Sequence, residues 1–287
     1  MSGTIKAVGF DLDGTFLKTH VDYSKLNGAD LRVLESHGIP WQDIDFGDSP
    51  KRPRAPVREW LEANGRGSEF PAISEEIDEA FTAIELEFVD EAAAFPGSRE
   101  CIPAIKAKGL KVGLLTRGSR RYAEAALEVN GLTGAFDVVM GRDYSDYDNA
   151  KPSPVAMMEF AGELDVSPSE ILYVGDNLTD WMSASGAGAM FAGVLSGSCK
   201  ESDWKKLDLD MPVIPFAGDV LSLLRSLHLC GDEVLDDIQE ALGAARGYGR
   251  PCSDAVPSAE PAYELRGGLH DSRQVEPAVD QRPVRPG

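Results

Sequence analysis

A short apolar run near the N-terminus ends abruptly in two aspartates, and this stretch constrains the fold more than any other. Residues 5–10 are too few for a helix and are typical of a strand that is buried on both faces. Asp11 and Asp13 follow, and side chains two apart in extended chain project toward the same side. Gly14 permits a sharp turn before Thr15. This pattern suits a metal site that presents a nucleophile better than it suits a core.

Composition limits the class of protein and its partners. A chain of 287 residues with 43% hydrophobic residues can form one large globular domain, or a core with an insertion. The net charge of -20 and the pI near 4.5 argue against nucleic acid and anionic membranes as partners. The sequence has neither a signal-peptide layout nor the roughly 18-residue apolar run of a membrane span. We therefore expect a cytoplasmic protein, and an anionic substrate remains compatible with local positive charge and a metal.

The cysteines predict neither a zinc site nor a disulfide framework. They are scattered through the chain, with no C-x-x-C pair and no companion histidines. We expect buried free thiols at all four positions, which are Cys101, Cys199, Cys230 and Cys252.

Residues 20–92 have the periodicity of a small helical unit. Leucines and Ile39 lie on one stripe that ends at His37-Gly38, and a short helix is expected at 57–63. A stronger helix follows, with apolar residues three or four apart at Ile73, Ile77, Phe81, Ile84 and Phe88. The stretch after the first stripe, residues 41–58, contains three prolines and the basic group Lys51-Arg52-Pro53-Arg54. We expect a solvated loop there, with recognition of an anionic substrate as the alternative.

From residue 93 onward, short buried strands alternate with amphipathic helices. This alternation predicts an α/β fold, namely a doubly wound parallel sheet with a small α-helical cap. Residues 1–19 and 93–230 would form the core, and residues 20–92 the cap. The expected strands are 111–115, 136–140, 171–174, 190–195 and an edge strand at 212–216, and the expected helices are 97–108, 119–129, 154–164, 179–186 and 219–227.

The C-terminal part of the chain has a different character. Apolar positions at Val234, Leu235, Ile238 and Leu242 predict one more helix within residues 231–246. Residues 247–287 are rich in Pro, Gly and Arg, and they are expected to be disordered because they cannot bury enough surface to offset the ordering entropy.

Polar side chains follow three further predicted strands. Thr116 and Arg117 come after the second strand, Lys151 precedes a helix that starts with proline, and Asp176 and Asp180 flank another helix start. Each residue has an ordinary structural interpretation, as a helix N-terminal residue, a solvated charge or a partner of a helix dipole. Ligands bind at the carboxyl ends of parallel strands, however, so the combination predicts one shared site.

The spacing of these groups resembles the four motifs of the haloacid dehalogenase-like (HAD) hydrolases. Asp11-x-Asp13-Gly-Thr resembles motif I, Thr116 motif II, Lys151 motif III, and Gly175-Asp176-x-x-x-Asp180 motif IV. The resemblance covers roughly residues 5–230. Arg117 departs from it, because many relatives carry asparagine there, and its side chain either contacts substrate or turns outward.

The resemblance implies a role for each residue. The side chains of Asp11 and Asp176 and the carbonyl of Asp13 would hold Mg²⁺, with Asp180 supporting these ligands. Asp11 would attack phosphorus, and Asp13 would protonate the leaving alcohol and then activate water. Thr116 and Lys151, and Arg117 if it faces the substrate, would bind the phosphoryl oxygens.

These roles indicate a phosphatase of small phosphorylated metabolites, similar in layout to phosphoglycolate phosphatases. A carboxylate at Asp13 distinguishes the chain from dehalogenases, which protonate no leaving alcohol. One alternative is a phosphomutase that resembles β-phosphoglucomutase. Another is a binding or regulatory protein on the same fold that has no catalytic activity. Such proteins usually lack one of the motif aspartates, but this sequence has every one of them.

Overall fold

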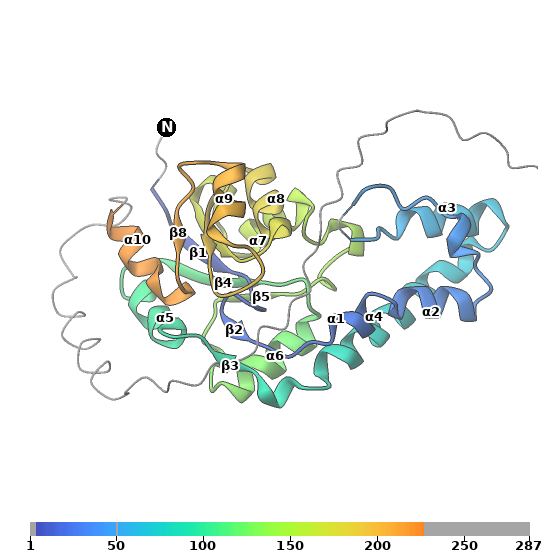
Figure 1. The fold of residues 1–287 in the computed structure, drawn as a ribbon, viewed down its shortest axis with the longest axis horizontal. Helices are drawn as coiled ribbons and strands as arrows, with labels where there is room; N and C mark the ends of the chain where they lie inside the picture. Colours follow the sequence, from blue (N-terminus) through green and yellow to red (C-terminus); the bar gives the residue numbers. More distant parts are fainter. Residues whose placement is uncertain (1–3, 50, 227–287) are drawn as a thin grey trace, which may run out of the picture. The chain divides into compact units, whose positions relative to one another are not determined.

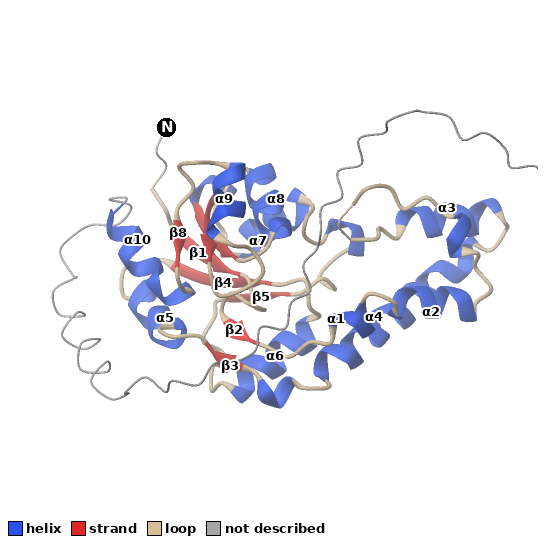
Figure 2. Ribbon diagram, viewed as in Figure 1, coloured by secondary structure: helices blue, strands red, loops and turns tan. Residues whose placement is uncertain are grey.

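The computed structural model describes residues 4–49 and 51–226, and within them six parallel strands form one sheet (Figures 1 and 2). The strand order is β5-β4-β1-β6-β7-β8, so the chain winds outward in both directions from a central β1. The strands are β1 Ala7–Phe10, β4 Lys111–Leu115, β5 Val138–Met140, β6 Ile171–Gly175, β7 Met190–Val194 and β8 Val213–Ile214. The predicted α/β fold with a doubly wound parallel sheet is confirmed.

Helices cover both faces of this sheet. They are α5 Ser98–Lys106, α6 Arg120–Val129, α7 Pro154–Glu163, α8 Leu178–Ala187, α9 Glu201–Leu207 and α10 Val220–Ser226. One hydrophobic cluster joins α5, α6 and α10 to the sheet, and a second joins α7, α8 and α9. Alternate side chains of β6 enter different clusters: Leu172 belongs to the first and Tyr173 to the second. The strands are therefore buried on both faces, as their continuous apolar sequences predict.

The central register brings three strand ends together. Phe10 of β1 pairs with Leu114 of β4 on one side and with Val174 of β6 on the other. Because all three strands are parallel, the residues that follow them meet at one edge of the sheet. Asp11 is one of these residues, and its backbone N–H continues the ladder by donating to the Val174 carbonyl at 2.9 Å.

Residues 20–92, which we call the cap segment, contain a hydrophobic cluster of their own. The α-helices here are α1 Tyr23–Leu26, α2 Ala29–Ser36, α3 Ala55–Ala63 and α4 Phe70–Leu86. The expected first helix is divided at Asn27-Gly28, since both residues are poor helix formers. Two short antiparallel strands, β2 Leu17–Lys18 and β3 Ala93–Ala94, lie where the chain leaves the core and returns to it.

Some elements differ from the predictions. The strand at 136–140 begins only at Val138, and the helix α9 was not predicted. Short 3₁₀ turns complete the connections at Trp41–Asp43, Gly67–Glu69, Val89–Glu91, Tyr147–Asn149, Pro168–Glu170 and Ala217–Asp219. The predicted helix at 231–246 and the predicted disordered tail at 247–287 lie outside the described residues.

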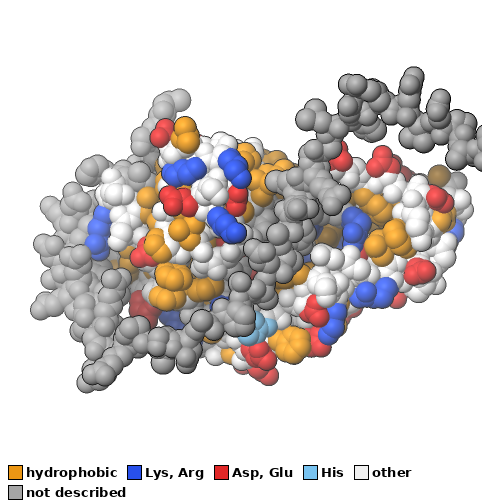
Figure 3. Space-filling model, viewed as in Figure 1, with side chains coloured by type: hydrophobic (Ala, Val, Ile, Leu, Met, Phe, Trp, Pro, Cys, Tyr) orange, Lys and Arg blue, Asp and Glu red, His pale blue; other side chains and the backbone are white. Residues whose placement is uncertain are grey.

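The surface carries mixed charges, and the described cysteines are free thiols. Figure 3 shows acidic and basic side chains spread among hydrophobic ones over one face. Among residues 4–49 and 51–226, every helix is too short or too polar to span a bilayer. Cys101 is a buried free thiol as expected, whereas Cys199 is a free thiol that is only half-buried. Cys230 and Cys252 fall outside the described part of the chain.

Candidate active site

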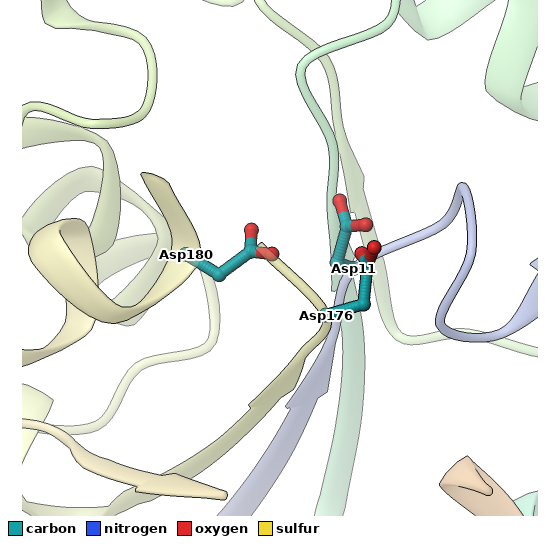
Figure 4. A group of neighbouring side chains, drawn as sticks. All are labelled: Asp11, Asp176 and Asp180. Carbon is teal, nitrogen blue, oxygen red and sulfur yellow. The ribbon is translucent and has the colours of Figure 1, made fainter. Parts of the chain in front are cut away.

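Three carboxylates converge at the carboxyl edge of the sheet. Asp11 follows β1, Asp176 follows β6, and Asp180 lies in the first turn of α8 (Figure 4). All three are buried, and each can offer one oxygen such that the three oxygens lie within 4.8 Å of one another. Asp180 is fixed by a capping box, in which its Oδ2 accepts from the backbone N–H of Asn177 at 3.0 Å. The structure therefore brings together three of the residues that the sequence analysis assigns to one shared site.

A buried lysine lies among these carboxylates. The Nζ of Lys151 donates to Asp11 Oδ1 at 2.7 Å, to Asp180 Oδ1 at 2.5 Å and to the Tyr173 hydroxyl at 2.9 Å. Burial alone would lower the pKa of Lys151, but the charges of Asp11 and Asp180 outweigh this effect and raise the pKa. The side chain therefore remains an ammonium ion, and all three of its N–H donors are used.

One ammonium ion does not balance three carboxylates. Burial and the nearby charge of Asp180 raise the pKa of Asp176 to about 6. Burial likewise raises the pKa of Asp11, against the opposing effect of Lys151. Both shifts express the cost of crowding negative charges away from water. A hard divalent cation with oxygen ligands would remove this cost, so the donor set fits Mg²⁺.

A loop that the sequence reasoning did not single out supports Asp176. The backbone N–H of Ser198 donates to Asp176 Oδ2 at 2.6 Å, and the hydroxyl of Ser196 donates to the Gly14 carbonyl at 2.7 Å. A Cβ at Gly197 would lie 2.1 Å from Asp176 Oδ2, so only glycine allows this approach. The signal in the sequence was the run Ser-Gly-Ser at residues 196–198, one residue after the end of β7.

Asp13 has different partners from Asp11. Its Oδ1 accepts from the hydroxyl of Thr19 at 2.6 Å and from the hydroxyl of Tyr122 at 2.5 Å. Its carboxylate is not one of the three that lie close enough to share an ion. Directly after Asp13 the chain turns at Gly14, whose φ of +77° is a conformation that glycine adopts without strain. Thr15 turns back to the three carboxylates and donates its hydroxyl to Asp176 Oδ1 at 3.1 Å.

The loop after β4 holds Thr116 and Arg117. Thr116 is buried, and its hydroxyl oxygen accepts from the Gly118 N–H at 3.0 Å. The Arg117 guanidinium donates to the Lys151 carbonyl and, at 2.7 Å, to the Tyr147 hydroxyl. Burial lowers the pKa of Arg117. Its described contacts thus connect the loop after β4 to the segment that carries Lys151.

A second charge cluster, which we call the cap–core joint, consists of the buried residues Arg54, Glu85 and Arg142 and the half-buried Asp78. Arg142 comes from the loop after β5, and it donates to Glu85 Oε1 and, at 3.2 Å, to Asp78 Oδ1. Arg54 donates to both oxygens of Asp78 at 2.8 Å. Glu85 Oε2 in turn accepts from the N–H and the hydroxyl of Ser119, each at 3.1 Å.

The predicted solvated basic loop is therefore wrong for two of its three charges. Arg54 is only 5% exposed, and its guanidinium lies 3.9 Å from the centre of the Tyr147 ring. Arg52 pairs with Asp30, with a nitrogen–oxygen distance of 2.7 Å. Lys51 differs from both. Burial, together with the positive charges of Arg117 and Arg52, lowers the pKa of Lys51 to about 8. The negative charge of Asp180 opposes this lowering.

The sequence is similar to known hydrolases over most of its length. A family model described as haloacid dehalogenase-like hydrolase matches residues 5–188, and a related HAD hydrolase-like model matches residues 149–241. The phosphoglycolate phosphatase of Shigella boydii is 26% identical over 81% of this chain and 98% of its own length. The N-acetylmuramic acid 6-phosphate phosphatase of Pseudomonas aeruginosa is 27% identical over 69% of this chain and 85% of its own.

Solved structures show the same fold. A HAD family hydrolase from Deinococcus radiodurans, solved with bound phosphate and sodium, aligns with a TM-score of 0.52 and 18% identity. The alignment covers 80% of this chain and 99% of that one. A hydrolase from Pseudomonas syringae aligns with a TM-score of 0.52 and 21% identity, over 77% and 98% of the two chains.

Proposed function

Because the chain belongs to the haloacid dehalogenase-like hydrolase family, we propose that it is a cytoplasmic, Mg²⁺-dependent phosphatase of small phosphorylated metabolites. The observation that carries the proposal is the ammonium of Lys151 bridging Asp11 and Asp180 beside the third carboxylate, Asp176. Such a site combines a nucleophile, a cation for phosphoryl oxygens and an unbalanced set of metal ligands.

The proposed reaction has two halves. In the first, an oxygen of Asp11 attacks phosphorus and forms an aspartyl-phosphate, while Asp13 gives a proton to the leaving alcohol. In the second, Asp13 takes a proton from water, which attacks the phosphoryl group and releases phosphate. Thr116 would hold the phosphoryl oxygens in both halves, and so would Lys151, by turning toward them the N–H that donates to Asp11 in the structure.

The metal would be held by the side chains of Asp11 and Asp176 and by the carbonyl of Asp13. When bound, Mg²⁺ supplies positive charge that offsets the negative charge on the phosphoryl oxygens. Asp180 would support the site by orienting Lys151, with which it pairs at 2.5 Å. Arg117 would act in the same way, because its contacts reach the Lys151 carbonyl and Tyr147.

Residues 1–19 and 93–230 would form the catalytic core, with residues 20–92 as a cap that closes over the substrate and excludes water. We further propose that the substrate is a phosphorylated carboxylic acid. The names of the two curated relatives both denote such compounds. Lys51 is the cation that would meet the substrate carboxylate, because it is a half-buried lysine of the cap segment and its neighbours Arg52 and Arg54 already pair with Asp30 and Asp78.

The test is a phosphate-release screen of phosphorylated metabolites, with and without Mg²⁺, that includes phosphoglycolate and N-acetylmuramic acid 6-phosphate. We expect release from phosphorylated acids that depends on Mg²⁺ and that disappears in Asp11→Asn. Absence of release from every compound, with pure folded protein and Mg²⁺, would reject the phosphatase proposal.

The same screen addresses the phosphomutase alternative. A mutase needs fixed cations for a second phosphate, but Arg52 and Arg54 already pair with Asp30 and Asp78. We therefore expect free phosphate as the dominant product when a hexose 1-phosphate and catalytic hexose bisphosphate are supplied. Isomerised sugar that forms much faster than phosphate would replace the phosphatase proposal with the mutase.

A further inference from the structure

The carboxylate of Asp13 is held by a tyrosine from another element. Tyr122 lies in the first turn of α6, directly after the loop that carries Thr116, and it is 1% exposed. Its hydroxyl and that of Thr19 lie 2.5 Å and 2.6 Å from the same oxygen, Asp13 Oδ1. Among the hydrogen bonds of the described residues, none reaches the other oxygen, Oδ2.

We propose that Tyr122 is a positioning residue that, together with Thr19, makes Oδ2 the oxygen through which Asp13 exchanges its proton. This inference rests on the proposed phosphatase function. A carboxylate oxygen that already accepts two hydrogen bonds has no free lone pair in the carboxyl plane, so a proton there would displace one donor. Oδ2 has no such competitor, and the acidic proton therefore resides on it.

The proton then follows one path through both halves of the reaction. In the first half the Oδ2–H bond breaks and the proton moves to the alcohol oxygen, while the Asp11 oxygen–phosphorus bond forms and the bond from phosphorus to the alcohol breaks. In the second half a water O–H bond breaks and its proton returns to Oδ2, while the water oxygen–phosphorus bond forms and the bond from phosphorus to the Asp11 oxygen breaks, which releases phosphate. Fixing Oδ1 orients Oδ2, and proton transfer requires such orientation to within hydrogen-bond reach.

The ring of Tyr122 and its hydroxyl have different contacts, so a substitution can remove one set and keep the other. The ring belongs to the hydrophobic cluster beneath α6, and a Cβ at Gly118 would lie 2.7 Å from it. The backbone N–H of Tyr122 donates to the hydroxyl of Ser119 at 3.2 Å, which fixes the start of the helix. Phenylalanine would keep all these contacts and lose only the bond to Asp13.

The experiment compares Tyr122→Phe with Tyr144→Phe. Tyr144 also donates its hydroxyl to a carboxylate, but it is 45% exposed and its partner is Glu163, which is none of the proposed site residues. The value of kcat/KM is measured for each purified protein with a series of phosphate monoesters whose leaving groups range from acidic phenols to simple alcohols. Acidic phenols leave without a proton, whereas alcohols need one from Asp13.

We expect Tyr122→Phe to lower kcat/KM about 10- to 30-fold for alcohol leaving groups and less than about threefold for acidic phenols. The plot of log kcat/KM against leaving-group pKa thus becomes steeper. Thr19→Val should steepen it as well, and Thr19→Ser, which keeps the hydroxyl, should restore the slope of the natural protein. Tyr144→Phe should match the natural protein throughout.

The outcomes separate this inference from the proposed function. An equal fall for all leaving groups in Tyr122→Phe, or no fall for any, would overturn the role of Tyr122 while the phosphatase assignment stands. A natural protein without phosphatase activity on any ester would overturn both.

Discussion

The strand-end site and the cap–core joint are both built around a buried cation that bridges carboxylates from different elements. At the strand end, Lys151 lies between Asp11 and Asp180, with Asp176 beside them. At the joint, Arg142 lies between Asp78 and Glu85, and Arg54 adds a second guanidinium. The joint therefore has two cations for two carboxylates, whereas the strand end has one cation for three carboxylates.

This difference in balance separates a structural ion network from a site that needs a further partner. A balanced buried pair needs no additional charge, but breaking it leaves an uncompensated ion in the interior. An unbalanced cluster is costly until another cation arrives, and such clusters concentrate at functional sites. We therefore expect substitutions at the joint to change mainly stability, and substitutions at the strand end to change mainly activity and metal response.

The largest expected effect is on activity at the strand end. Asp11→Asn removes the proposed nucleophile and should lower kcat by at least about 10⁴-fold, as losses of nucleophiles do. Asparagine is nearly isosteric and removes one excess negative charge, so the thermal midpoint without Mg²⁺ should not fall. Phosphate release and thermal unfolding of the same sample check both parts. Turnover at the natural rate in a well-folded variant would reject the covalent mechanism.

The next effect is on stability at the joint. Arg142→Met removes the guanidinium that pairs with both Glu85 and Asp78, and it should lower the free energy of unfolding by about 3–5 kcal/mol. The double variant with Glu85→Gln should cost less than the sum of the single changes, because the two residues are in contact. Urea unfolding at pH 7 measures these values. A loss below about 1 kcal/mol in Arg142→Met would mean that the joint contributes little net stability.

The contrast in charge balance also predicts a metal response. Mg²⁺ at about 100 times its dissociation constant should stabilise the natural protein by about 2.7 kcal/mol, because it binds the folded state. Asp176→Asn removes one proposed ligand and should remove this stabilisation, whereas a joint variant such as Glu85→Gln should retain it. Thermal unfolding with Mg²⁺ and with a chelator provides the comparison. Equal stabilisation of the natural protein and Asp176→Asn would place the ion elsewhere.

The two regions were not equally predictable from the sequence. At the strand end each polar residue directly follows a strand or begins a helix, so strand order and parallel direction were enough to bring the residues together. At the joint, Arg142 and Glu85 are 57 residues apart, and no local pattern marks either as buried. Their pairing depends on where α4 packs, which only the folded arrangement determines.

Three short elements, α9, β2 and β3, were also missed because they carry no periodic signal. The helix α9 was missed because it is short and mostly polar, and its buried side chain is Trp204. A Cβ at Gly193 would come within 2.7 Å of that indole, so a glycine in β7 makes room for it. This fit between a glycine and a distant tryptophan leaves no periodic signal. The strands β2 and β3 have two residues each and are too short for a pattern to show.

The smallest expected effect separates two residues of a single basic run, Lys51 and Arg54. Arg54→Met should destabilise the protein and leave kcat/KM of the folded fraction within about threefold, since its guanidinium is engaged by Asp78. Lys51→Met should leave stability nearly unchanged and lower kcat/KM for a phosphorylated acid about 5- to 10-fold at pH 7, the value of one charged contact.

The loss of kcat/KM in Lys51→Met should also depend on pH, and the pKa of Lys51 predicts that the loss becomes smaller as the pH rises. This pKa is lowered to about 8, because burial and the nearby charges of Arg117 and Arg52 disfavour the ammonium form. At pH 7 most Lys51 is charged and attracts the substrate carboxylate, whereas at pH 9 most is neutral. The ratio of kcat/KM between the natural protein and Lys51→Met should therefore fall from about 5–10 toward 1 as the pH rises through 8. Groups common to both proteins cancel in this ratio. Lys51→Arg stays charged and should keep the advantage at pH 9, so a ratio that does not change with pH would show that Lys51 does not bind the substrate through its charge.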